Sequence, residues 1–115
     1  MATAFNPQVG DVGHEIVVDF ETCDCDGNII PLDLSPVGTV ITICLRKPDQ
    51  TTVKEFTGGV STCDTLANGV TSFITVATDL DVAGTWCVSG KVVFTDGRIF
   101  RGNASNLVVE QPVCP

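Results

Sequence analysis

The sequence has few of the residues on which most binding and catalytic sites depend. Among 115 residues it has no tyrosine, one tryptophan, one histidine and six lysines and arginines. The basic residues are scattered, which argues against a nucleic-acid partner, because nucleic acid is bound by clustered positive charge. No apolar run is long enough to span a bilayer, so no membrane partner is expected. Residues 1–5 lack the basic start and apolar core of a signal peptide, which predicts synthesis in the cytoplasm without export.

Patterns typical of enzymes and metal sites are also missing. His14 stands alone at a strand start, where a surface residue is a better interpretation than a general base. No Cys-x-x-Cys pair opens a helix, as a redox enzyme requires. We therefore expect no enzymatic activity and no cofactor. Calcium bound by carboxylates stays an open alternative, although the spacing is not that of a calcium loop. The candidate ligands are Asp19, Glu21, Asp24, Asp26 and Asn28.

What the sequence does contain is β-branched residues and turn formers. Hydrophobic residues make up 43% of the chain, much of it valine and isoleucine, beside 11 glycines and 6 prolines. This composition predicts strands and turns, and the length predicts one domain. We expect an extended N-terminal arm over residues 1–13, a β domain over 14–110 and a C-terminal tail over 111–115. The net charge of −8 favours solubility.

Alternating apolar residues and turn signals predict about seven short strands. In the first of them, Ile16, Val18 and Phe20 share one face. The expected strands cover residues 14–21, 29–34, 38–46, 51–57, 70–77 and 85–94, with a last strand or pair over 98–110. Short strands separated by regular turns in this way are typical of a β-sandwich.

The segment 78–86 predicts a tight corner that leads into a strand. Gly84 lets the chain turn, and Trp86 begins a run of β-forming residues. A large aromatic residue directly after such a corner usually fills the core of a β-sandwich. Trp86 is therefore predicted to be a core residue rather than one that stacks on a sugar, and Val88 and Val92 are expected to point inward with it.

Seven turn motifs occur in a characteristic order along the chain. They are Asp11-Val12-Gly13, Asp26-Gly27-Asn28, Leu32-Asp33-Leu34, Leu45-Arg46-Lys47-Pro48-Asp49-Gln50-Thr51-Thr52, Asn68-Gly69-Val70, Asp79-Leu80-Asp81-Val82-Ala83-Gly84-Thr85-Trp86 and Thr95-Asp96-Gly97. Their order and spacing resemble the immunoglobulin-like domains of tailed-phage structural proteins. The similarity covers nearly the whole chain and is strongest to the N-terminal domain family of baseplate upper proteins and to related small fibre or head-decoration domains.

The resemblance implies an immunoglobulin-like β-sandwich that serves as a structural part of a tailed-bacteriophage virion. Its partners would be fibre, baseplate or capsid subunits in an oligomeric assembly. A tail-fibre or baseplate attachment component is the expected function, because the strongest similarity is to baseplate proteins. Capsid decoration is the alternative within this class. A module that binds glycans on the host surface is the alternative from another class.

The six cysteines depart from the family pattern. So many thiols are unusual in a chain without an export signal. A virion component that is made in the cytoplasm and released by lysis resolves this conflict. In an immunoglobulin-like topology, the strand ends near five of the cysteines lie at one pole, and Cys63 lies at or near the other. These five are Cys23, Cys25, Cys44, Cys87 and Cys114.

The assumed topology predicts a disulfide between Cys44 and Cys87. The two residues lie on neighbouring antiparallel strands, on the face opposite the core. A register that pairs Ile41 with Gly90 would place the thiols opposite each other, within the span of a disulfide. Two unrelated surface thiols, or a structural zinc held by thiolates at that pole, are the alternatives.

A second predicted disulfide fastens the C-terminal tail. One of Cys23 and Cys25 is expected to reach Cys114, because the first and last strands of the assumed topology run side by side. Cys63 and the spare member of the Cys23/Cys25 pair are then left without an internal partner. Leftover thiols indicate bonds to another chain, so both are candidates for a covalent link to a neighbouring virion subunit.

Overall fold

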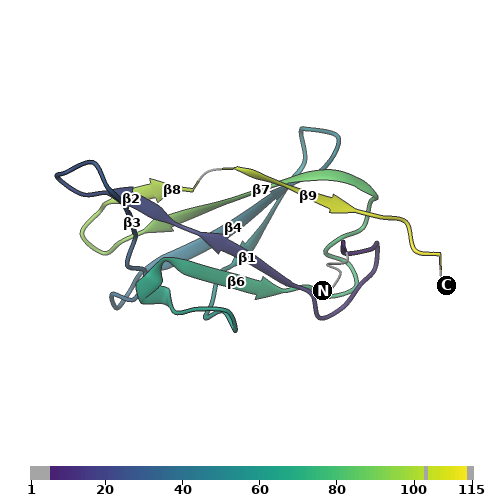
Figure 1. The fold of residues 1–115 in the computed structure, drawn as a ribbon. Coiled ribbons are helices and arrows are strands. Elements are labelled where there is room, and N and C mark those ends of the chain that lie inside the picture. The colour runs from purple at the N-terminus through teal and green to yellow at the C-terminus, as the bar shows by residue number, and fades with distance from the viewer. Residues whose placement is uncertain (1–5, 103, 114–115) are drawn as a thin grey trace, which may run out of the picture.

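The structure of the protein, a computed structural model, describes residues 6–102 and 104–113. It is an all-β structure of short strands with one 3₁₀ helix, η1 (Leu66–Asn68) (Figure 1). The strands are β1 (Glu15–Asp19), β2 (Glu21–Cys23), β3 (Ile29–Pro31), β4 (Val40–Arg46), β5 (Val53–Thr57), β6 (Val70–Ile74), β7 (Gly84–Val93), β8 (Ile99–Arg101) and β9 (Ser105–Val109). No helix in this part of the chain is long and apolar enough to cross a membrane.

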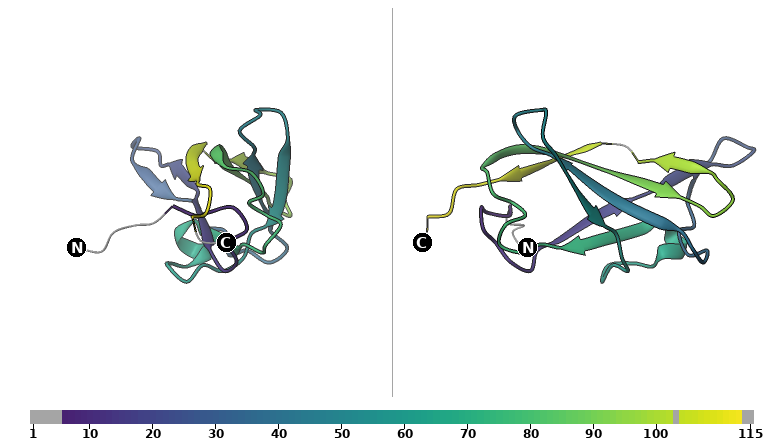
Figure 2. Two further views of the ribbon diagram at one scale, coloured as in Figure 1. Left: turned by 90° about the vertical axis from the view of Figure 1, so that its right-hand side faces the viewer. Right: turned by 180° about the vertical axis from the view of Figure 1, so that it is seen from behind.

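The strands form three hydrogen-bonded groups. The largest is a five-stranded sheet in the order β5-β4-β7, in which β8 and β9 both pair with the second edge of β7. β1 pairs with β6, and β2 pairs with β3 in a hairpin. All these pairings are antiparallel. The β2–β3 hairpin projects at one end of the elongated molecule, while β9 runs toward the other end (Figures 1 and 2).

The hydrophobic core lies between the five-stranded sheet and the β1–β6 pair. Along β7, buried and half-buried residues alternate, because successive side chains of a strand point to opposite faces. Phe56 of β5 stacks on Phe73 of β6 with ring centroids 4.1 Å apart, which joins the two layers. The core residues are Ile16, Val18, Phe20, Leu32, Leu34, Ile41, Ile43, Leu45, Phe73, Leu80, Trp86, Val88, Val92, Phe94 and Val109.

The all-β class predicted from the sequence is confirmed, but the strands are more numerous and shorter than expected. The predicted strand 14–21 changes partner at Phe20. Its N–H donates to the carbonyl of Gly69, next to β6, and its carbonyl accepts from the N–H of Leu32, next to β3. The predicted last strand or pair over 98–110 is a pair, β8 and β9, separated after Arg101.

Trp86 is a core residue, as the corner motif over residues 78–86 predicts. The Trp86 side chain has no exposed surface, and its Nε1 donates to the carbonyl of Val82 at 2.9 Å. This bond satisfies the one polar atom of the ring, so the buried indole carries no unpaired donor. Cys87, the next residue, is half-buried on the opposite face of β7.

Candidate functional site

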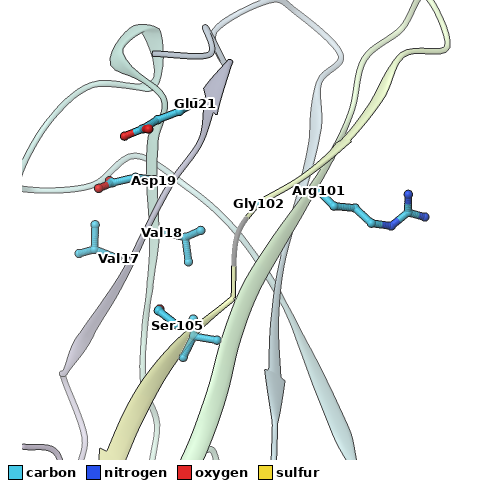
Figure 3. Close-up of a pocket in the computed structure, with 8 residues that line it drawn as sticks. Val17, Val18, Asp19, Glu21, Arg101, Gly102 and Ser105 are labelled. Carbon is cyan, nitrogen blue, oxygen red and sulfur yellow. The ribbon is translucent and has the colours of Figure 1, made fainter. Parts of the chain in front are cut away.

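A cleft of about 320 Å³ opens between β1 and the β8–β9 side of the large sheet. Figure 3 shows Val18 and Ser105 facing this gap, whereas Arg101 points away from it on one side and Asp19 on the other. The charged side chains of Arg101 and Asp19 therefore lie at the rim of the cleft, and its lining is more polar than apolar. The lining residues are Val17, Val18, Asp19, Glu21, Val88, Arg101, Gly102 and Ser105.

One wall of the cleft is an unpaired strand edge. Thr75 N–H donates to the His14 carbonyl, and Phe20 N–H donates to the Gly69 carbonyl, so the even-numbered residues of β1 bond toward β6. Main-chain groups alternate in direction along a strand. The N–H and C=O of Val17 and Asp19 therefore point toward the cleft, and no described residue pairs with them.

The other wall contains a second unpaired edge. Glu110 donates its N–H to the Pro7 carbonyl and accepts from the Val9 N–H, both at 3.0 Å, on the side of β9 away from β7. By the same alternation, the main-chain groups of Val108 and Asn106 point away from β7. They too have no main-chain partner among the described residues. The cleft thus lies between two strand edges with unsatisfied hydrogen-bonding capacity.

The predicted register between Cys44 and Cys87 is wrong. Ile41 pairs with Val92 rather than with Gly90, so Cys44 lies opposite Ser89 and Cys87 lies opposite Arg46. Alternation has a period of two, so sequence patterns do not distinguish registers that differ by two residues. The observed register keeps all seven residues of β4 paired with β7.

Cys44 and Cys87 are therefore diagonal neighbours on the outer face of the sheet. They line one shallow hollow of about 280 Å³ and are both free thiols. Diagonal α-carbons lie about 7–8 Å apart, whereas a disulfide bridges roughly 4.4–6.8 Å. Burial, and then the negative charge of Glu55, raise the pKa of the Cys44 thiol. The structure thus contains no disulfide between this pair.

The prediction that five cysteines share one pole is also wrong. Cys23 and Cys25 are exposed free thiols in the projecting β2–β3 hairpin. Glu110, by contrast, pairs with Gln8 beyond the far end of β9. Cys114 lies outside the described residues, so the predicted disulfide from Cys23 or Cys25 to Cys114 stays a prediction. The first and last strands, which the prediction placed side by side, are not hydrogen-bonded neighbours.

Cys63 lies in a loop that is fastened to β1 by a carboxylate. Glu15 accepts hydrogen bonds from the Thr62 N–H at 2.9 Å, the Thr62 hydroxyl at 2.7 Å, the Ser72 hydroxyl at 2.9 Å and the Cys63 thiol at 3.5 Å. Donation by Thr62, first from its N–H and then from its hydroxyl, lowers the pKa of Glu15 from 4.5 to about 2. Cys63 is nonetheless exposed and is a free thiol.

His14 and Asp24 both make local contacts. His14 Nε2 lies 2.9 Å from a carboxylate oxygen of Asp11. Asp24 accepts from the N–H groups of Asp26 and Asn28, both at 2.9 Å, and so closes the hairpin turn. Within residues 6–102 and 104–113, no three histidine, cysteine or acidic side chains lie close enough together to hold a metal ion. Neither the zinc nor the calcium alternative finds a ligand set there.

Exposed apolar residues gather at the end of the molecule that carries the β2–β3 hairpin. Val40 of β4 pairs with Val93, which pairs with Ile99 of β8. We call this region the hairpin end. Its exposed apolar side chains are Ile29, Ile30, Val37, Val40 and Ile99, and Cys23 and Cys25 are exposed beside them. Ile29 and Val37 expose 70% and 94% of their surface. Sequence patterns missed this region because its residues come from β3, β4, β8 and the loop before β4, which are far apart in the sequence.

No protein family, no curated protein and no solved structure matches this chain. The resemblance to tailed-phage domains therefore stays a prediction from the turn motifs.

Proposed function

We propose that this chain is an immunoglobulin-like β-sandwich that serves as a structural part of a tailed-bacteriophage virion, specifically a tail-fibre or baseplate attachment component. The order of the seven turn motifs supports the class. The observation that carries the attachment role is the hairpin end. Large exposed apolar residues that cluster on a surface usually mark a site of contact with another protein.

The hairpin end offers two kinds of contact to a neighbouring subunit. Ile29, Ile30 and Val37 supply apolar surface that a partner can cover. Cys23 and Cys25 supply thiols for a covalent link, and Cys63 supplies a third, in the loop beside β1. Because a virion meets an oxidising exterior after lysis, exposed thiols at a subunit contact can be oxidised there to intermolecular disulfides.

Localisation in the particle tests the proposal. A tagged copy of the chain should be seen by electron microscopy at the tail tip or on the fibres. Density on the capsid surface would instead assign the chain to capsid decoration, and absence from purified particles would refute a virion role. Non-reducing electrophoresis of the same particles should show the chain above monomer mass. A monomer band without reductant would refute the covalent link.

The glycan-binding alternative has little aromatic surface to draw on. Trp86, the one tryptophan in the chain, is fully buried and has no face available for a sugar. Phe20 and Phe94 are also core residues. A glycan array probed with the purified chain separates the two functions, since a structural attachment component should bind no array member.

A further inference from the structure

Cys44 and Cys87 bring two sulfur donors to one hollow on the outer face of the large sheet. Both residues are half-buried, and both thiols are free. They lie on β4 and β7, offset from each other by two residues. Each of these strands is paired along both of its edges, so the backbone that carries the two thiols is rigid. The pair is thus held in place before any ligand arrives.

The spacing of this pair suits a metal bridge better than a disulfide. Diagonal α-carbons lie about 7–8 Å apart, whereas a disulfide, with an S–S bond of about 2.05 Å, spans roughly 4.4–6.8 Å. An ion between two sulfurs, with metal–sulfur bonds of about 2.3 Å, holds the sulfurs up to about 4.6 Å apart. The reach then grows by about 2.5 Å, and the diagonal spacing falls within it.

The rest of the hollow offers no ligand to a hard cation. Its other lining residues are Arg46, Val53, Ser89 and Ala104, which include no carboxylate and no imidazole. The Ser89 hydroxyl already donates to the Gly102 carbonyl at 3.0 Å. Zinc takes four ligands, and calcium takes six or more oxygens. Copper(I), by contrast, is selected by thiolates and accepts two of them in a nearly linear arrangement.

From this arrangement we propose that Cys44 and Cys87 form a two-thiolate site for a soft monovalent cation of the copper(I) class. Binding replaces the proton of each thiol by a bond to the metal. Both protons pass to solvent, so no oxidant is needed. The bound centre carries one negative charge. Arg46 and Lys91, on the same face of the sheet, compensate this charge, and Glu55, opposite Cys44 on β5, works against them.

The exposed cysteines would compete for the same ion and must be removed in the test. Cys23, Cys25 and Cys63 are exposed free thiols. The test therefore uses the 115-residue chain with Cys23→Ser, Cys25→Ser, Cys63→Ser and Cys114→Ser. In this four-serine chain, the two thiols of the hollow are the remaining sulfur ligands of the cysteine type.

Anaerobic titration with copper(I), in competition with the chelator bathocuproine disulfonate, measures binding. The four-serine chain should bind one copper(I). Adding Cys44→Ser or Cys87→Ser should weaken binding about 100-fold, because the second sulfur binds at a high effective concentration. Replacing both should add little to the loss, since the two thiols act as one unit. Val53→Ala is the matched control, because Val53 lines the hollow without a donor and should leave the affinity unchanged.

Two results would overturn the site. One is binding of two ions per chain, or binding that survives the loss of either thiol, because the thiols would then act independently. The other is zinc bound as tightly as copper(I), which would refute the soft monovalent class. Trp86 fluorescence checks that each variant is folded, and Cys44→Ala and Cys87→Ala replace any serine variant that is not. The site is independent of a role in a virus particle, so its failure leaves the proposed function standing.

Discussion

A single residue, Gly90, shows how closely the two layers of this fold approach each other. A Cβ built on Gly90 would lie 2.5 Å from Cζ of Phe20 and 3.1 Å from Cγ1 of Val18. Both neighbours are core residues and have little room to move. The absence of a side chain in the middle of β7 is therefore what admits the Phe20 ring between the layers.

Replacing this glycine should destabilise the protein. Gly90→Ala forces the Phe20 ring from its position, and overpacking of this kind costs roughly 1–3 kcal/mol. Urea denaturation followed by Trp86 fluorescence measures the change. Gly59→Ala is the matched control, because its Cβ would meet only the Ser72 carbonyl, at 4.0 Å, and should change stability by about 0.5 kcal/mol or less. Equal effects of the two substitutions would contradict the close approach.

At the level of single residues, the sequence predicted correctly which side chains are buried where apolar and polar residues alternate along a strand. The inward facing of Ile16, Val18 and Phe20 and the buried position of Trp86 both follow from a period of two and a corner motif, and all four residues are in the core. Glu15 gave no such signal. Its hydrogen-bond donors lie 47 and 57 residues away in the sequence, and nothing in a strand pattern indicates which distant loop will reach a carboxylate.

At the scale of elements, that carboxylate fastens the loop after β5 onto the β1–β6 pair. Glu15 holds Thr62 and Ser72 together, and the pKa of Glu15 is lowered to about 2. A group whose folded pKa lies below its unfolded value stabilises the fold above the unfolded value. The contribution is thus complete above pH 4.5, the ordinary value for this group, and is lost as the pH falls toward 2.

Glu15→Gln should therefore lower stability at pH 7 and change its dependence on acid. The glutamine side chain turns an NH₂ donor toward Thr62 and Ser72, which are themselves donors. The variant should therefore be less stable than the native chain at pH 7. Between pH 4.5 and 2 the native chain should lose this advantage, so that the two stabilities converge. Urea denaturation midpoints of both proteins, measured at several pH values between 7 and 2, check this convergence. Glu21→Gln, at an exposed position in β2, should follow the native chain, and a constant gap for Glu15→Gln would disprove the anchoring role.

Element boundaries were less predictable than element type. The run 14–21 reads as one strand, yet at Phe20 its partner changes from β6 to β3. The backbone direction continues through this point, so no turn residue marks it. Which strand edges stay unpaired is equally hidden, because alternation reports side-chain facing and not the identity of the hydrogen-bond partner. The cleft between β1 and β9 therefore had no signal in the sequence.

For the whole molecule, the free thiols act as markers of three separate surfaces. Cys23 and Cys25 mark the hairpin end, Cys63 marks the loop beside β1, and Cys44 and Cys87 mark the outer face of the large sheet. The described cysteines are free rather than paired, so a thiol reagent can report each surface separately.

The purified chain should be alkylated first at the hairpin end. Cys25 is exposed, whereas Cys44 is half-buried and its pKa is raised. Alkylation proceeds through the thiolate and needs access, so Cys25 should react about tenfold faster than Cys44. Peptide mass spectrometry after brief exposure to iodoacetamide gives both rates. If the hairpin end is the attachment surface, reduced intact particles should reverse this order, because a neighbouring subunit covers Cys25 while the outer sheet face stays open. Unchanged rates in the particle would mean that the neighbour binds another surface.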